Sequence, residues 1–496
     1  MQKLSLPIMQ LKKIPAFLFI LYIVFFVFSC KKDDFSTDTS YTLAFSEDTI
    51  MFDTVFASVG SATEVFTVYN TNDEALKVST IRLATGNSSP YRLNVDGMPG
   101  KEFHDVEIGA HDSIFIFVEV TVDPQNINTP YIVSDSILFE TNSNLQDVDL
   151  VAFGQRAVYH HWRPDDSPLL TFPYFIVNQN GSESWSDSLP HVFYGYGIVD
   201  SATTLTINPG THIYMHPGAV LFVYNSATLH IDGTPSQQVV IQGDRLSYDY
   251  HDVPGQWERI YFLPGSKNST IRNAIIRNGN IGLQADTFAS ANDSTLYLEN
   301  TIVENMVTHA LLLEGAKVSA YNCVFSNCGS NVANIVYGGD YKFYHCTFAN
   351  FWQNSTRQDP VLTMSNYYNG GPRMLNAWFG NSIIYGDNDQ EFGIDSINLS
   401  NFYNFHFDHC LMKVEPSFGT STPFHYSNIL RANGSNNQPR FHDVTVNDYT
   451  LDTLSACVNS GDPAILNIFP GVLNNDILGN SRLIDIPDLG AYERQQ

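Results

Sequence analysis

The chain has 496 residues, with 51 acidic against 25 basic residues and a formal net charge of −26. This acidic balance argues against nucleic-acid binding, because such a surface repels phosphate backbones and anionic lipid headgroups. Charged residues make up only 15% of the chain while aromatic residues reach 13%. That composition argues against disorder and indicates a β-rich fold.

The N-terminus has the pattern of a secretory signal. Three lysines precede an uncharged apolar run over residues 14–28, which is too short to span a bilayer comfortably. The run ends in Val-Phe-Ser-Cys, which resembles the lipobox of bacterial lipoproteins, although Phe28 is bulkier than the usual residue there. The resemblance implies that residues 1–29 are cleaved off and that Cys30 receives lipid (diacylglycerol and palmitate). The alternative is an uncleaved membrane anchor.

The residues after the cysteine bear on localisation. Lys31-Lys32-Asp33-Asp34 resembles the short tag that sends some gram-negative lipoproteins to the outer face of the outer membrane. We therefore expect an outer-membrane protein, anchored in the membrane by lipid and facing the cell exterior. Loss of the signal peptide removes three lysines and no acidic residue, so the net charge of −26 would become −29.

A first domain is predicted over residues 41–156, after a lipidated tether over residues 30–40. Apolar and polar residues alternate with a period of two in several short runs, which indicates about eight strands of a β-sandwich. The clearest runs are 64–70, 113–120 and 135–139. The segment resembles immunoglobulin-like (Ig-like) domains of the hydin and abnormal-spindle type. The matching features are Tyr69-Asn70, Leu76, Ile108-Gly109-Ala110, Val122-Asp123-Pro124 and residues 148–154. Nothing in this domain indicates catalysis.

Residues 157–445 contain an internal repeat, which predicts the fold of the second domain. The unit reads apolar-x-apolar-x-Asn/His-small-apolar-apolar-x-Asn. It recurs at residues 271–278, 298–305, 320–327 and 343–350, with looser copies at 381–384 and 409–412. Steps in the low twenties between copies are typical of one coil of a right-handed parallel β-helix. Each coil buries its apolar face only by stacking on its neighbours. The predicted fold class is therefore all-β, a sandwich followed by a β-helix.

The repeated polar residues predict structural ladders. Asparagine tolerates left-handed backbone at a bend and can hydrogen-bond to its equivalent one coil away. The two expected ladders are Asn273, Asn300, Asn322 and Asn278, Asn305, Asn327, Asn350. A row of sugar-binding amides is the alternative. Cys323, Cys346 and Cys410 share one repeat position, which favours stacked buried thiols over a ligand or redox role.

Two further stretches resemble bacterial β-helix surface lipoproteins. Residues 254–260 match their Pro-Gly-Gln-Trp-x-x-Ile signature, with Glu258 where glycine is usual. The C-terminal segment over residues 446–496 resembles the ending of parallel β-helix repeat proteins of the pectin-lyase-like type. Its matching stretches are 448–451, 455–462, 476–482 and 488–493. The expected role of this segment is capping, because an open last coil would expose strand edges.

The sequence lacks the catalytic motifs of polysaccharide lyases and polygalacturonase-type hydrolases with a β-helix fold. No Gly-His-Gly, Arg-Ile-Lys or repeat-borne Asp-Asp pair occurs, and no zinc-ligand spacing. One loop combines acidic, imidazole and aromatic side chains and is the candidate ligand-binding site: Asp244, Tyr248, Asp249, His251, Asp252 and Trp257. The alternative is a polar loop that closes a coil. We predict no metal and no cofactor, with Ca²⁺ only if the protein is an enzyme.

Three functions stay open on this basis. The first is a non-catalytic surface protein that binds a polysaccharide, surface glycan or another envelope component. The second is a polysaccharide lyase or glycoside hydrolase, which a groove with three or more converging carboxylates beside a lysine or arginine would favour. The third is a structural envelope component.

A recurrent tripeptide predicts covalent modification. Aspartate followed by serine or threonine and then a small or aliphatic residue resembles the O-glycosylation acceptor motif of surface proteins in some gram-negative bacteria. The acceptors would be Thr49, Thr54, Ser113, Ser136, Ser188, Ser201, Ser294, Ser396 and Thr453. The alternative is turn chemistry, because Asp-Ser and Asp-Thr open turns that lead into strands.

Overall fold

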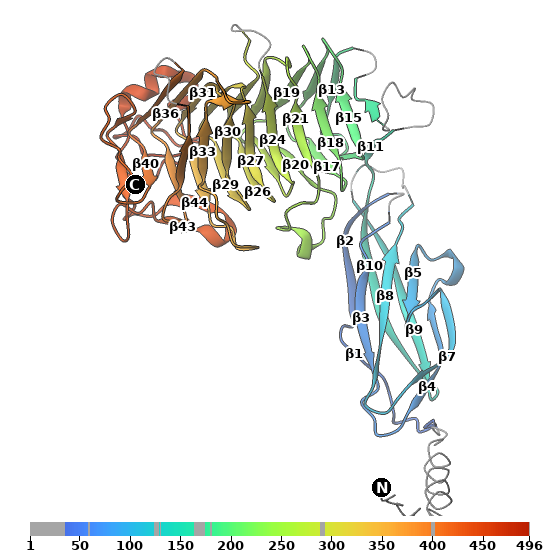
Figure 1. Cartoon of the computed structure of the whole chain (residues 1–496). Coiled ribbons are helices and arrows are strands. Elements are labelled where there is room, and N and C mark those ends of the chain that lie inside the picture. The colour runs from blue at the N-terminus through green and yellow to red at the C-terminus, as the bar shows by residue number, and fades with distance from the viewer. Residues whose placement is uncertain are drawn as a thin grey trace, which may run out of the picture. The chain divides into compact units, whose positions relative to one another are not determined.

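The computed structural model describes residues 35–57, 60–123, 128, 130–162, 174–178, 181–287, 293–397 and 402–495 (Figure 1). The predicted signal peptide (residues 1–29) and the predicted lipidation site, Cys30, lie outside these residues. The chain forms two compact units, one over residues 1–123 and 131–154, the other over 124–130 and 155–496. Within the described part, no helix is long and apolar enough to cross a bilayer.

The first unit is an antiparallel β-sandwich of two five-stranded sheets, as the predicted fold class requires. The first sheet contains β1 (Ala44–Phe45), β3 (Glu64–Tyr69), β8 (Ser113–Val120), β5 (Tyr91–Val95) and β6 (Met98–Gly100). The second contains β2 (Thr49–Phe56), β10 (Asn144–Gln155), β9 (Tyr131–Thr141), β4 (Leu76–Leu83) and β7 (Glu102–Ile108), and a short 3-10 helix, η1 (Gly86–Ser88), follows β4. Alternate residues of β8 are buried, which is the pattern that the period-two run predicted.

The second unit is a parallel β-helix built from three long sheets, named here sheets 1, 2 and 3 in the order in which each coil visits them. Sheet 1 contains β11 (Val158–His160), β14 (His191–Phe193), β17 (His212–Met215), β20 (Val239–Gly243), β23 (Ala274–Arg277), β26 (Ile302–Met306), β29 (Val324–Cys328), β32 (Thr347–Asn350), β37 (Ile383–Gly386), β40 (Leu411–Lys413) and β42 (Leu430–Ala432). Sheet 2 contains β12 (Tyr174–Ile176), β15 (Tyr196–Val199), β18 (Val220–Val223), β21 (Arg259–Phe262), β24 (Ile281–Asp286), β27 (His309–Glu314), β30 (Ala333–Val336), β33 (Leu362–Ser365) and β38 (Phe392–Asp395). Sheet 3 contains β13 (Glu183–Trp185), β16 (Thr204–Ile207), β19 (Thr228–Asp232), β22 (Ser269–Arg272), β25 (Leu296–Glu299), β28 (Lys317–Tyr321), β31 (Gly339–Tyr344), β36 (Leu375–Gly380), β39 (Tyr403–Asp408) and β41 (Tyr426–Ser427).

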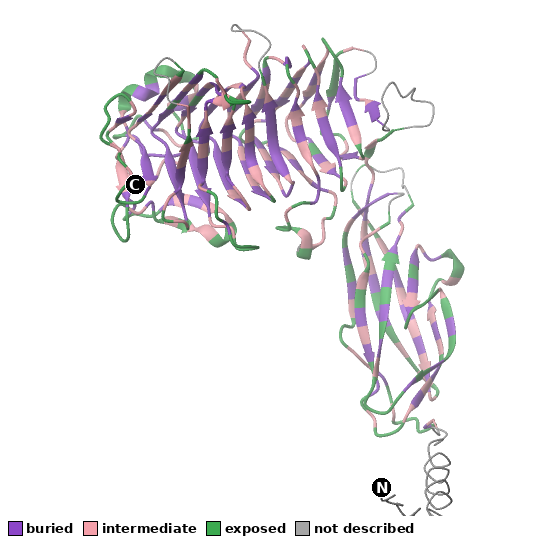
Figure 2. Ribbon diagram, in the orientation of Figure 1, coloured by how far each residue is buried: buried purple, intermediate pink, exposed green. Residues whose placement is uncertain are grey.

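The core of the β-helix follows from this stacking. Buried residues form bands along the strands of the coils (Figure 2). Inward side chains such as Ile271, Leu298 and Ala320 are fully buried and belong to one continuous cluster. Each coil therefore completes the apolar core of the next, as the repeat predicted.

The predicted asparagine ladders are present at two corners of the coil. Between sheets 3 and 1, Asn273, Asn300 and Asn322 all have positive φ. The Asn300 amide donates to Asn273 Oδ1 over 3.4 Å, and the Asn322 amide donates to Asn300 Oδ1 over 3.2 Å. Between sheets 1 and 2, the Asn305 amide donates to Asn278 Oδ1 over 2.7 Å. These contacts support the structural interpretation of the repeated amides.

One predicted ladder member differs from the others. Asn350 does not have the left-handed backbone of Asn278, Asn305 and Asn327. It lies within β32, and its amide donates to the carbonyl of Cys328 one coil earlier over 2.8 Å. The long excursion after residue 350 explains the difference, because the chain there leaves the coil and does not bend tightly into sheet 2.

The cysteines of the described part are unpaired and buried, in agreement with the packing role predicted for them. Cys323 and Cys346 lie on adjacent coils and contact each other through their thiols. Burial raises the pKa of the Cys346 thiol well above its ordinary value. The uncharged thiol behaves as a small apolar side chain in this position.

The C-terminal segment lies along the side of the β-helix as well as beside its last strand (Figure 1). Its elements are β43 (Phe441–Asp443), η3 (Val444–Val446), β44 (Asp448–Leu451), η4 (Pro463–Ile468) and α2 (Pro470–Leu473). The Asn322 amide donates to the carbonyls of Val472 and Asn475, so this segment binds the first asparagine ladder. The segment therefore covers the outer surface of several coils, in addition to the capping role predicted for it.

A buried arginine fixes this segment. Arg482 is fully buried and pairs with Glu493 over 3.0 Å. The Arg482 guanidinium also donates to Asn322 Oδ1 of the ladder and to the carbonyls of Gly490 and Ala491. An ion pair that is this well hydrogen-bonded offsets its desolvation, and loss of one partner would leave an unpaired buried charge.

A candidate glycan-binding cleft

A cleft of about 690 Å³ lies over the corner where the coils pass from sheet 2 to sheet 3. Its lining comes from four successive coils: Asp286 and Thr287; Glu314, Gly315 and Lys317; Tyr337, Gly339 and Asp340; Tyr368, Arg373, Met374 and Asn376. A small hairpin, β34 (Tyr367–Tyr368) with β35 (Gly371–Pro372), is inserted at this corner between β33 and β36 and supplies part of one wall. None of these residues was predicted as a site from the sequence.

Two exposed tyrosines form an aromatic wall of the cleft. Tyr337 and Tyr368 are 39% and 43% exposed, and their ring centroids lie 4.8 Å apart in an edge-to-face arrangement. The Arg373 guanidinium lies 5.6 Å from the Tyr368 ring centroid, close enough for a cation–π contact. Exposed aromatic faces beside polar groups are the usual means of binding sugar rings and other flat, partly apolar ligands.

The backbone at Tyr337 is strained. Its φ is +64°, a conformation that a bulky side chain rarely adopts, and Gly338 and Gly339 follow with φ of +72° and +120°. A Cβ atom at position 338 would lie only 2.3 Å from the Met374 carbonyl oxygen, so a residue larger than glycine does not fit there. Strain of this kind costs about 1–3 kcal/mol and is concentrated at functional sites. The turn holds the Tyr337 ring outward over the cleft.

Two carboxyl groups meet on the floor of the cleft. Asp286 and Glu314 are register partners at the ends of β24 and β27, so their side chains leave adjacent strands about 4.8 Å apart. Burial, a hydrogen bond to Asp286 and the charge of Asp286 together raise the pKa of Glu314 to about 7. That hydrogen bond requires a proton on one of the two groups, because ionised carboxylates have no donor.

Polar neighbours hold the pair in place from the preceding coils. The Tyr261 hydroxyl donates to Asp286 Oδ2 over 2.7 Å, while the buried Oδ1 has no donor from any other side chain in the described part. The Gln284 amide donates to Glu314 Oε2 over 3.3 Å, and Arg259 donates to Gln284 Oε1 over 2.7 Å. The floor of the cleft is therefore a connected network across β21, β24 and β27.

The loop predicted to bind a ligand has a different arrangement. It projects between β20 and β21 and contains the 3-10 helix η2 (Tyr248–Tyr250) (Figure 1). Asp244 pairs with His216 over 2.6 Å, His251 pairs with Asp252 over 3.0 Å, and Asp249 is exposed. The side chain of Tyr248 lies outside the described set. Trp257 is fully buried and donates to the Arg277 carbonyl, so it belongs to the core.

The same loop is attached to the second asparagine ladder. The amides of Asn278 and Asn305 donate to the carbonyls of His251 and Asp252. Among the predicted residues whose side chains the structure describes, Trp257 is therefore separated from the exposed part of the loop by its burial in the core. The contacts favour the alternative that the sequence left open, a polar loop that closes a coil.

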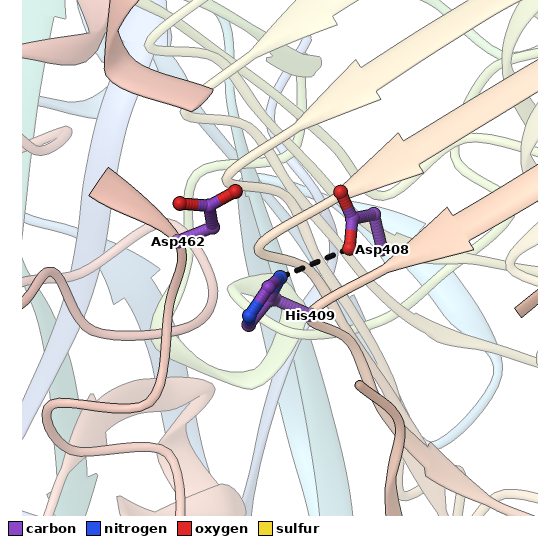
Figure 3. Close-up of side chains that lie close together, drawn as sticks. All are labelled: Asp408, His409 and Asp462. Carbon is purple, nitrogen blue, oxygen red and sulfur yellow. Dashed lines mark hydrogen bonds and ion pairs between the residues drawn. The ribbon is translucent and has the colours of Figure 1, made fainter. Parts of the chain in front are cut away.

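A further polar cluster joins the C-terminal segment to the last coils. Asp408, His409 and Asp462 point toward one another, and one possible ligand atom from each lies within 4.8 Å of the others (Figure 3). His409 Nδ1 is 2.9 Å from Asp408 Oδ1, and Asp462 caps η4 by accepting from the Ala464 amide. By distance the three could hold a metal ion, yet each already has a partner within the protein. The cluster serves as a polar link between β39 and η4.

The predicted O-glycosylation acceptors fall into two groups. Ser188, Ser201 and Thr453 are exposed, whereas the remaining six are half-buried. Several of the aspartates accept from the next backbone amide: Asp53 from Thr54, Asp112 from Ser113 and Asp200 from Ser201. Turn chemistry therefore accounts for these copies of the motif, and modification stays a prediction.

Comparisons with known proteins do not assign a family. No family model matches the sequence, and no curated protein is similar to it. Among solved structures, the catalytic unit of an α-1,3-glucanase of Streptomyces thermodiastaticus is 10% identical, with 75% of this chain and 89% of that chain covered and a TM-score of 0.26. A family 123 glycoside hydrolase of Clostridium perfringens is 9% identical, with 24% and 30% covered and a TM-score of 0.17.

The sandwich also has solved neighbours. The E. coli chaperone DraB is 12% identical, with 23% of this chain and 55% of that chain covered and a TM-score of 0.17. TM-scores at this level carry no argument about function.

The carboxyl pair predicts a measurable pH dependence. The pKa of Glu314 is about 7 in the folded protein against an ordinary value of 4.5, so folding favours its protonated form. Its contribution to the free energy of unfolding is complete below pH 4.5 and is lost as pH rises through 7. We expect Glu314→Gln, which cannot ionise, to lose less stability than the wild type between pH 5.5 and 8, measured by urea unfolding of the β-helix.

In Glu314→Gln the free energy of unfolding should still fall with rising pH, although less steeply than in the wild type, because Glu304 and Glu493 also have a pKa of about 7. Glu107→Gln, on the sandwich, is the matched control and should follow the wild type. An equal loss of stability in Glu314→Gln and the wild type would contradict the proposed protonation of the pair.

Proposed function

We propose that the protein is a lipid-anchored surface protein that binds a glycan in the cleft at the corner between sheets 2 and 3. The observation that carries this proposal is the combination of two exposed tyrosine rings with carboxyl, amide and cationic groups in one cleft of about 690 Å³. Sugar rings present both apolar faces and hydroxyl groups, and such a lining can satisfy both. A non-catalytic binding role is the first hypothesis.

A second candidate function, polysaccharide lyase or glycoside hydrolase activity, has a specific observation in its favour. Asp286, Glu314 and Asp340 line the same cleft as Lys317 and Arg373, and a lyase needs a base of that kind beside carboxylates. The hydrogen-bonded contact between Asp286 and Glu314 argues against a hydrolase. Paired hydrolytic carboxyl groups lie about 5–9.5 Å apart, with the sugar between them.

Glycan binding should depend on the aromatic wall. On an array of polysaccharides and oligosaccharides, we expect binding that Tyr337→Asn and Tyr368→Ala each weaken about tenfold or more, because each removes an exposed anchor. Asparagine suits the left-handed backbone at position 337, so the first variant removes the ring without adding strain. Affinities for any glycan found would then be measured by calorimetry.

Tyr69→Ala is the matched control, because Tyr69 is equally exposed at 39% but lies on the sandwich. The same glycan would be assayed for reducing ends and unsaturated products. We expect no new reducing ends and no unsaturated products. Unsaturated products that the wild type forms and Lys317→Ala does not would establish the lyase instead. Binding that is indifferent to both tyrosine variants would refute this cleft as the site.

Localisation to the outer membrane is proposed on the sequence features of residues 1–34. We expect Cys30→Ala to block lipidation and to leave uncleaved or mislocalised precursor, detected by fractionation and by the intact mass of the protein from its native host. In the wild type, the mass should also reveal any glycan, for which the exposed Ser188, Ser201 and Thr453 are the most accessible acceptors. Normal maturation and membrane association of Cys30→Ala would overturn the lipoprotein assignment.

A further inference from the structure

Among the residues that the structure describes, no ion pair neutralises the carboxyl pair on the floor of the cleft. Neither Asp286 nor Glu314 forms an ion pair with a lysine or arginine in the described part of the chain. The positive group nearest to them in the network, Arg259, donates to Gln284 rather than to either carboxyl group. The strand register nevertheless forces the two acidic side chains together. Two carboxylates in contact repel each other strongly unless a proton or another cation lies between them.

The donors around the pair leave one place open. Tyr261 donates to Asp286 Oδ2 and Gln284 donates to Glu314 Oε2, so each carboxyl group has one oxygen satisfied by the protein. Asp286 Oδ1 is buried, and within the part of the chain that the structure describes it accepts no hydrogen bond from a side chain other than that of Glu314. A group with several N–H donors and a positive charge would satisfy this oxygen and replace the shared proton.

We propose that the Asp286–Glu314 pair binds the protonated amine of an amino sugar, which makes the cleft selective for amine-bearing glycans. This inference rests on the proposed glycan-binding function and names the substrate class of that site. The tyrosine wall would stack on the sugar ring while its ammonium group reaches the carboxyl pair. Asp340 adds a third carboxyl group to the lining, beside the cationic side chains of Lys317 and Arg373.

The surrounding donors distinguish an ammonium from a divalent metal. Calcium takes six to eight oxygen ligands, as a rule from carboxylates, carbonyls and water. Around this pair, Gln284 presents its amide nitrogen and Tyr261 its hydroxyl hydrogen, because their bonds to Glu314 and Asp286 run in that direction. An ammonium has three donors and needs only the two carboxyl groups and one further acceptor.

The test compares two oligosaccharides with the same backbone. Binding of a β-1,4-linked glucosamine tetramer and of its N-acetylated counterpart would be measured by calorimetry at pH 7 with EDTA present. We expect the wild type to bind the amine-bearing tetramer about tenfold more tightly or better, as a charge-assisted hydrogen bond implies. In Glu314→Gln, which keeps the shape but not the charge, the preference should fall to about threefold or less.

Glu304→Gln is the matched control. Glu304 is another outward carboxyl group with a pKa of about 7, but it lies in sheet 1, away from the sheet 2 strands of the pair. This variant should keep the full preference of the wild type. Loss of preference in both variants would indicate a general effect of charge and would overturn the proposal.

The remaining outcomes separate this inference from the function on which it rests. Equal affinity for the two tetramers, lost in Tyr337→Asn, would overturn the amine subsite and leave glycan binding intact. If the protein binds neither tetramer but binds a different glycan through Tyr337, the amine subsite would likewise be overturned and the glycan-binding function would stand. Calcium binding to the wild type that Glu314→Gln abolishes, with no preference between tetramers, would replace the amine by a metal.

Discussion

The register between successive coils is the constraint on which the rest of this structure depends. Parallel strands one coil apart are spaced about 4.8 Å, so residues at equivalent positions form columns along the β-helix. Inward columns of Ile, Leu and Val make the core, and polar columns at the corners make the asparagine ladders. The same rule places Asp286 directly beside Glu314. The register that stabilises an amide ladder also brings carboxyl groups together when acidic residues occupy equivalent positions on adjacent coils.

The cleft follows from the corner at which the coils are least regular. From β22 onward, an asparagine or histidine in left-handed backbone closes each described bend between sheets 3 and 1. Between sheets 2 and 3 the connection varies, from two residues after β27 to a segment with its own hairpin after β33. Irregular connections that project side by side from a rigid stack create a concave surface without disturbing the core. The regular corners stabilise the fold, and the irregular one carries the candidate site.

This division explains how far the sequence alone could lead. The repeat was recognisable because residues 271–278 and their copies span the end of sheet 3, the left-handed bend and the start of sheet 1, where geometry restricts the residue types. Asp286 and Glu314 end strands of sheet 2 and lie 28 residues apart in unrelated local sequence, so only the register reveals their contact. Trp257 misled the site prediction because it is adjacent to the loop in sequence but packs into the core. The hairpin that contains Tyr368 turns at Asn369-Gly370, a dipeptide typical of hairpin turns, but that local signal does not indicate which other coils the hairpin adjoins.

A crystal structure of the protein with a bound glycan would show whether the cleft between sheets 2 and 3 is the binding site. We expect a sugar ring against Tyr337 and Tyr368, with a polar substituent of that ring at the Asp286–Glu314 pair. A glycan bound instead on the loop over residues 244–256, or along the outer asparagine ladders, would contradict it.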